Sequence, residues 1–135
     1  MSTAVSIEDL SFTYSGQTDP ALKDISARIE EGSFVGIMGH GGAGKSSLCY
    51  SLNALIPKFF RGRYSGRVFI KGKEAAKETV ASLSRLVGEV FQDFESQLFS
   101  TNVELELAFG PENHGLPCPE IERRVKEALK IIGLE

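Results

Sequence analysis

The segment that decides the fold reads Gly39-His40-Gly41-Gly42-Ala43-Gly44-Lys45-Ser46, and it matches the pattern G-x-x-x-x-G-K-[ST]. Glycines in such a loop let several backbone N–H groups point into one concavity, because these backbone conformations exclude a side chain. An apolar run at residues 33–38 precedes the loop, and a helical pattern over residues 45–56 follows it. Strand, loop and helix in this order form the context in which the pattern binds phosphate groups.

Two side chains of this phosphate loop (residues 39–46) carry its chemistry. Lys45 supplies a mobile cation for the β- and γ-phosphates, and Ser46 offers a hydroxyl to Mg²⁺. We therefore expect ATP and Mg²⁺ as ligands, with Ser46 as a metal ligand. For His40, two interpretations stay open: a loop side chain that faces solvent, or a contact to phosphate. The expected nucleotide-binding residues of the loop and its helix are Gly39, His40, Gly41, Gly42, Ala43, Gly44, Lys45, Ser46 and Ser47.

The same loop also spells G-x-G-x-x-G, the pattern of dinucleotide-binding folds, through Gly39, Gly41 and Gly44. Such a site needs an acidic residue about 20 positions further on, which holds a ribose hydroxyl. No Asp or Glu occurs between Gly39 and Glu74. The dinucleotide interpretation therefore fails.

Composition sets the class of protein. The 135 residues fit one soluble domain, with 41% hydrophobic and 24% charged residues. A net charge of −3 argues against nucleic acid as a partner, since nucleic-acid binders usually carry a basic excess. No run approaches the ~20 apolar residues that span a bilayer, and no signal peptide is recognisable. Cys49 and Cys118 are far apart, which fits free thiols in a reducing cytosol.

The hydropathy pattern predicts alternating strands and helices around the phosphate loop. Pro119 suits the first turn of the clearest helix, and Gly133 suits its end. Thr101 is a candidate cap for the helix before it. We expect strands at residues 5–14, 21–29, 33–38, 66–72 and 86–91, and helices at residues 45–56, 101–109 and 119–132.

Three motifs give the chain a resemblance to a known family. Leu10-Ser11-Phe12-Thr13-Tyr14, the phosphate loop and Val90-Phe91-Gln92-Asp93 together resemble the ABC ATPases. The runs at residues 97–100 (QLFS) and 108–111 (AFGP) are similar to the ATPases of energy-coupling-factor importers, which take up vitamins and cobalt or nickel ions. Leu55-Ile56-Pro57, followed by a basic and aromatic insertion, resembles the fused two-ATPase members of that group.

The resemblance implies a fold, a function and partners. The fold would be α/β, a partial P-loop NTPase core of the ABC type over residues 1–100, with an N-terminal antiparallel β-segment. Residues 101–135 would begin the helical subdomain. The function would be ATP hydrolysis that drives uptake of a vitamin or metal ion. The partners would be transmembrane importer subunits and a second ATPase subunit or domain, at the cytoplasmic face of the cell membrane.

The resemblance also assigns two residues outside the loop. Tyr14 would stack on adenine, and Gln92 would act in catalysis by sensing Mg²⁺ and the attacking water. From the residues alone, Tyr14 is a strand aromatic that packs in the core, because it shares a strand face with Phe12. Gln92 alone is a solvated polar residue. The basic stretch from Lys58 to Lys73 is interpreted as a solvated face rather than a contact to lipid headgroups.

The sequence departs from the family in several places. His40-Gly41 stands where Pro-Asn is usual, and Phe94 where Pro is usual. The signature Leu-Ser-Gly-Gly-Gln, the strand ending in Asp-Glu and the switch histidine are absent from the 135 residues. We therefore expect a truncated ATPase with little activity alone. The alternatives left open are a nucleotide-binding fragment without turnover and a small-molecule P-loop kinase.

Overall fold

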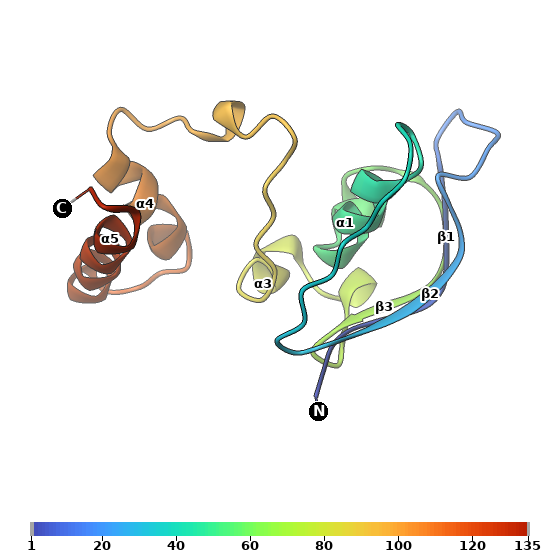
Figure 1. Cartoon of the computed structure of the whole chain (residues 1–135), viewed down its shortest axis with the longest axis horizontal. Coiled ribbons are helices and arrows are strands. Elements are labelled where there is room, and N and C mark those ends of the chain that lie inside the picture. The colour runs from blue at the N-terminus through green and yellow to red at the C-terminus, as the bar shows by residue number, and fades with distance from the viewer. Residues whose placement is uncertain (1, 135) are drawn as a thin grey trace. The chain divides into compact units, whose positions relative to one another are not determined.

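The structure is a computed structural model that describes residues 2–134 (Figure 1). The chain forms two compact units, Met1–Glu89 and Val90–Glu135, and each is described by itself. The domain boundary that we expected at residue 100 stays a prediction.

The first unit is built on a four-stranded antiparallel sheet with the order β2-β1-β3-β4. Its strands are β1 (Thr3–Tyr14), β2 (Leu22–Glu30), β3 (Gly62–Ile70) and β4 (Lys73–Glu74). Ile7 and Leu10 are both buried, although residues three apart on a regular strand face opposite sides. A register shift between them, where Asp9 has φ 48°, turns both side chains to the same face. The expected antiparallel β-segment is therefore confirmed.

Helices cover one face of this sheet and enclose the core (Figure 1). They are α1 (Lys45–Leu52), α2 (Leu55–Lys58), α3 (Val80–Leu83) and the 3₁₀ turn η1 (Ala75–Lys77). Burial of apolar side chains between the sheet and these helices is the main stabilising contribution to this unit. The core consists of Ile7, Leu10, Phe12, Leu22, Ala54, Ile56, Val68, Ile70, Ala75 and Leu83.

The second unit contains η2 (Glu95–Gln97), α4 (Val103–Asn113) and α5 (Cys118–Ile132), and α4 packs against α5. Helix α5 begins with a proline in its first turn and ends at Gly133, whose φ of 73° is left-handed, as predicted. The predicted cap of α4 was wrong. Asn102 rather than Thr101 caps it, because the Asn102 side-chain oxygen accepts a 2.8 Å hydrogen bond from the Leu105 backbone N–H.

Two expected strands do not form. Residues 33–38 and 86–91 have no strand structure, and Phe34, Met38 and Val90 are 101%, 96% and 80% exposed. A strand of a parallel sheet needs neighbours that accept and donate its backbone hydrogen bonds. Within residues 2–134 the sheet is antiparallel and pairs neither segment, so their apolar patterns alone do not make strands.

Several element boundaries also differ from the prediction; the helix expected at residues 101–109, for example, is α4 at Val103–Asn113. The helix after the phosphate loop ends at Leu52 rather than residue 56, because Ala54 adopts a left-handed φ of 62°. Strand β3 begins at Gly62 rather than Gly66. Gly66 is an irregularity inside the strand, with φ 86°, and a Cβ there would lie 2.4 Å from the carbonyl oxygen of Asp9. The pattern suggested a strand start where the chain has a bulge.

Candidate phosphate-binding site

The phosphate loop leads directly into helix α1, and glycine is required where the two meet. Gly44 precedes α1 with a left-handed φ of 87°, and Gly42 has φ 79°. A Cβ on Gly44 would lie 2.2 Å from the carbonyl oxygen of Ala21, the residue directly before β2. The loop is therefore held close to the sheet at Gly44, whereas a Cβ on Gly42 would meet nothing within 4 Å.

Lys45 folds back across the loop. Its Nζ donates hydrogen bonds to the carbonyl oxygens of Gly39, at 2.7 Å, and His40, at 2.8 Å. The ammonium thus links the end of the loop, at Lys45, to the first two residues of the loop and places a positive charge beside its backbone. A phosphate oxygen is a stronger acceptor for this ammonium than a neutral carbonyl, because both partners are then charged.

The first turn of α1 suits an anion. It contains no acidic residue, so the positive end of the helix dipole is not neutralised there. Ser46 is exposed on this turn, which leaves its hydroxyl accessible to a cation. His40 is exposed as well, and its ring Nδ1 lies 2.7 Å from the carbonyl oxygen of Gly41. The residues present fit a bound triphosphate.

Tyr14 lies at the end of β1 and reaches the same helix turn. Its hydroxyl oxygen is 2.9 Å from Oγ of Ser47, which is 7% exposed. The half-buried Tyr14 ring meets the rings of Phe12 and Phe60 edge-on, with centroids 4.8 and 6.2 Å away. Tyr14 therefore packs on the core and also touches the candidate site, while adenine stacking stays a prediction.

Sequence reasoning missed two neighbours of the site. Ala21 supplies the carbonyl that makes Gly44 obligatory. Phe60, which we placed in a solvated stretch, stacks on Tyr50 of α1 at 5.0 Å and meets Tyr14. A signal was present, because Phe60 stands among aromatic residues in the otherwise basic insertion.

Only one of the two expected metal ligands lies in the first unit. Ser46 belongs to that unit, whereas Gln92 is an exposed residue of the second unit, so its role stays a prediction. Among residues 2–134, no group of three or more His, Cys, Asp or Glu side chains could hold a metal. Mg²⁺ suits such a site, because it binds through phosphate oxygens and water with few protein ligands.

A group of polar side chains lies at the C-terminal end of α1. Asn53 Nδ2 donates a hydrogen bond to the carboxylate of Glu89. Burial raises the pKa of Glu89, and the Asn53 hydrogen bond opposes this rise. Burial and the nearby Glu89 charge raise the pKa of the Cys49 thiol. Cys49 therefore stays protonated near neutral pH and is a poor nucleophile.

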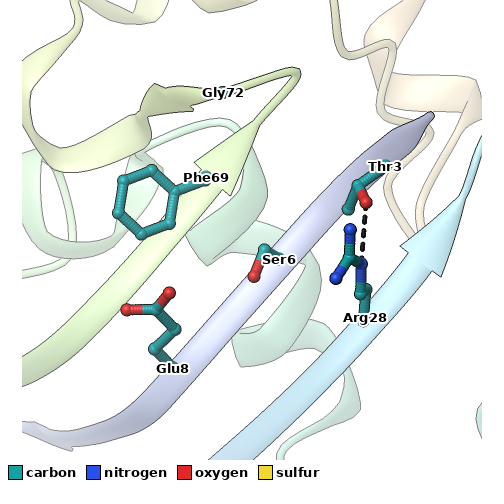
Figure 2. Close-up of a pocket in the computed structure, with 6 residues that line it drawn as sticks. All are labelled: Thr3, Ser6, Glu8, Arg28, Phe69 and Gly72. Atoms are coloured by element: carbon teal, nitrogen blue, oxygen red, sulfur yellow. Dashed lines mark hydrogen bonds between the residues drawn. The ribbon is translucent and has the colours of Figure 1, made fainter.

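A separate pocket of about 300 Å³ lies on the sheet face opposite the core (Figure 2). Its charged groups are paired: Arg28 donates to Thr3 at 2.7 Å, and Glu8 forms an ion pair with Arg67. It contains none of the residues predicted for the nucleotide site. Its lining residues are Thr3, Ser6, Glu8, Arg28, Phe69 and Gly72.

Comparison with known proteins places the chain in a family. A family model described as "ABC transporter" matches residues 22–135. The chain belongs to the ABC transporter family. The small-molecule kinase interpretation is therefore disfavoured. Among residues 2–134, no helix combines the length and apolar character needed to cross a membrane.

Two relatives bear the name of an ABC transporter ATP-binding protein. The chain is 49% identical over 130 residues to one from Caldanaerobacter subterraneus, covering 96% of this chain and 23% of the relative. It is 41% identical over 130 residues to one from Pyrococcus abyssi, covering 96% of this chain and 46% of the relative. The chain thus spans less than half the length of each of these relatives.

Two solved structures share the fold. One is cbiO1 from Clostridium perfringens, part of the ABC transporter complex cbiONQ, with a TM-score of 0.81 and 35% identity. That match covers 100% of this chain and 52% of cbiO1. The other is a bacterial Atm1-family ABC exporter with ATP bound, with a TM-score of 0.64 and 32% identity over 78% of this chain and 17% of the exporter. The expected partial ABC ATPase fold is confirmed.

Proposed function

We propose that the chain binds Mg·ATP through the phosphate loop, as part of an ATPase subunit that drives solute uptake. The observation that carries this proposal is the loop geometry: Lys45, the first residue of α1, donates to the Gly39 and His40 carbonyls, and the first turn of α1 has no acidic side chain. ATP bound to the Atm1-family exporter, which has the same fold, supports the choice of ligand.

Each residue of the site would have one task. Backbone N–H groups of residues 39–46 cradle the phosphates, and Lys45 leaves the two carbonyls to meet the β- and γ-phosphate oxygens. Ser46 directs its hydroxyl to Mg²⁺, which when bound neutralises charge on the phosphates. Tyr14 offers a ring face to adenine, and Gln92 orients the attacking water. These tasks position the triphosphate and balance its charge.

The importer assignment rests on the runs at residues 97–100 and 108–111 and on similarity to cbiO1 of the cbiONQ complex. We infer an energy-coupling-factor importer with a vitamin or metal ion as cargo. Its partners would be transmembrane subunits and a second ATPase subunit or domain. The chain would then act at the cytoplasmic face of the membrane, as a peripheral subunit.

The test is calorimetric titration of Mg·ATP into the purified chain and its Lys45→Ala variant. Loss of the charge-assisted contact is worth roughly 1.5–3 kcal/mol, so we expect affinity to fall about 10- to 100-fold. Lys58→Ala removes an exposed lysine from α2 of the same unit and should leave affinity unchanged. Equal affinity in the wild type and Lys45→Ala would refute the assignment.

A further inference from the structure

Tyr14 and Ser47 form a hydrogen bond that connects the end of β1 to the first turn of α1. The two hydroxyl oxygens are 2.9 Å apart in a partly buried setting. The rings of Phe12 and Phe60 both meet the Tyr14 ring edge-on. Ser47 follows Ser46, the expected Mg²⁺ ligand, and is itself 7% exposed. The bond therefore reaches the phosphate site from outside the loop.

Either hydroxyl can donate in this bond, and the chemistry of the two groups favours one direction. A phenol, with a pKa near ~10, is a much stronger acid than a serine alcohol, so Tyr14 is the better donor. Ser47 Oγ then accepts, and its own proton is left for a different acceptor. Hydrogen bonds in such a chain strengthen one another, because each polarises the next.

A second serine on the same helix shows the usual alternative. Ser51 donates its hydroxyl to the backbone carbonyl of Leu48, at 2.6 Å, as helical serines commonly do. A serine engaged in this way cannot present its proton to a ligand. Ser47 instead has the Tyr14 hydroxyl at its oxygen, at the end of α1 where a phosphate would bind.

We propose that Tyr14 is a positioning residue for phosphate binding: its hydroxyl holds Ser47 so that the serine hydroxyl donates to a phosphate oxygen of the nucleotide. This role rests on the proposed function and is separate from adenine stacking. Stacking needs the tyrosine ring and a base, whereas the hydroxyl role needs the oxygen of Tyr14 and no base. The two can therefore be separated by a ligand without adenine.

The experiment titrates inorganic triphosphate with Mg²⁺ into the purified chain and its Tyr14→Phe variant. Losing one hydrogen bond at a partly buried site should weaken triphosphate binding about 3- to 10-fold. ATP should lose affinity by the same factor, since the phenylalanine ring remains. Tyr64→Phe removes another half-buried tyrosyl hydroxyl, on β3, and should leave both affinities unchanged. Unchanged triphosphate affinity in Tyr14→Phe overturns the proposal.

A double-mutant cycle identifies Ser47 as the partner. Tyr14→Phe should cause no further loss once Ser47→Ala is present, because the same hydrogen bond is already missing. An equal loss in both backgrounds overturns the proposal, since Tyr14 would then act by another route. Thermal unfolding of each variant shows that binding is measured on folded protein.

The Lys45→Ala variant distinguishes failure of the phosphate-loop site from failure of the Tyr14 role. Triphosphate affinity that is absent in the wild type, or unchanged in Lys45→Ala, contradicts the phosphate-loop site and the Tyr14 role together. A loss in Lys45→Ala with none in Tyr14→Phe contradicts the Tyr14 role alone.

Discussion

At the scale of single residues, Gly44 shows how closely the loop is fitted to the sheet. Alanine there would need a left-handed φ and would place its Cβ 2.2 Å from the Ala21 carbonyl oxygen. We expect Gly44→Ala to lower the free energy of unfolding by about 3 kcal/mol or more and to abolish triphosphate binding. Urea unfolding and calorimetry measure the two effects.

Gly42→Ala is the matched control for this prediction. Gly42 has a similar φ of 79°, but a Cβ there would meet nothing within 4 Å. The loss in free energy of unfolding should come only from the left-handed backbone conformation of the alanine, about 1–2 kcal/mol. If both variants lose the same stability, then the contact with Ala21 does not determine the residue at position 44.

At the scale of elements, the first turns of α5 carry a pH-sensitive cluster. Hydrogen bonds from Arg123 and Arg124 lower the pKa of Glu120 from 4.5 to about 2. A carboxyl with a depressed folded-state pKa stabilises the fold above its unfolded pKa, and this contribution is lost as pH falls through the folded value. The contribution of Glu120 should therefore be present at neutral pH and disappear between pH 4.5 and about 2.

We expect the amides of α5 to lose protection against hydrogen exchange over this pH window. Glu120→Gln should remove this pH dependence of the exchange protection. Added salt should reduce it, because the cluster is exposed to solvent. Glu122→Gln, which removes another carboxylate from the same helix, should keep it. A pH profile in Glu120→Gln identical to the wild type would contradict the role of this cluster.

Elements with local signals were predictable from the sequence. The α5 helix has an amphipathic pattern, a proline in its first turn and a glycine at its end, and each signal acts within a few residues. The phosphate loop was recognisable for the same reason. The segments at residues 33–38 and 86–91 were not, since a strand depends on neighbours distant in sequence. The contacts of Phe60 and Ala21 with the site are likewise non-local.

At the scale of the whole molecule, binding and turnover should be separable. In the proposed site the loop would contact one side of a triphosphate, and the 135 residues contain no Leu-Ser-Gly-Gly-Gln signature that would approach the other side. Missing a general base costs typically 10²–10⁴-fold in rate, and missing charge stabilisation costs more. We expect the purified chain to release phosphate from saturating Mg·ATP at background rate. Turnover of about 1 per second, lost in Lys45→Ala, would contradict this expectation.

The central claim, that residues 39–46 hold the phosphates of Mg·ATP, is tested most directly by amide chemical shifts in ¹⁵N-labelled protein. Titration with Mg·ATP should move the backbone amide signals of Gly42, Gly44 and their loop neighbours first. The Lys45→Ala variant should require far more ligand for the same change. Unmoved loop amides, with shifts instead at the sheet pocket around Glu8 and Arg28, would contradict the account.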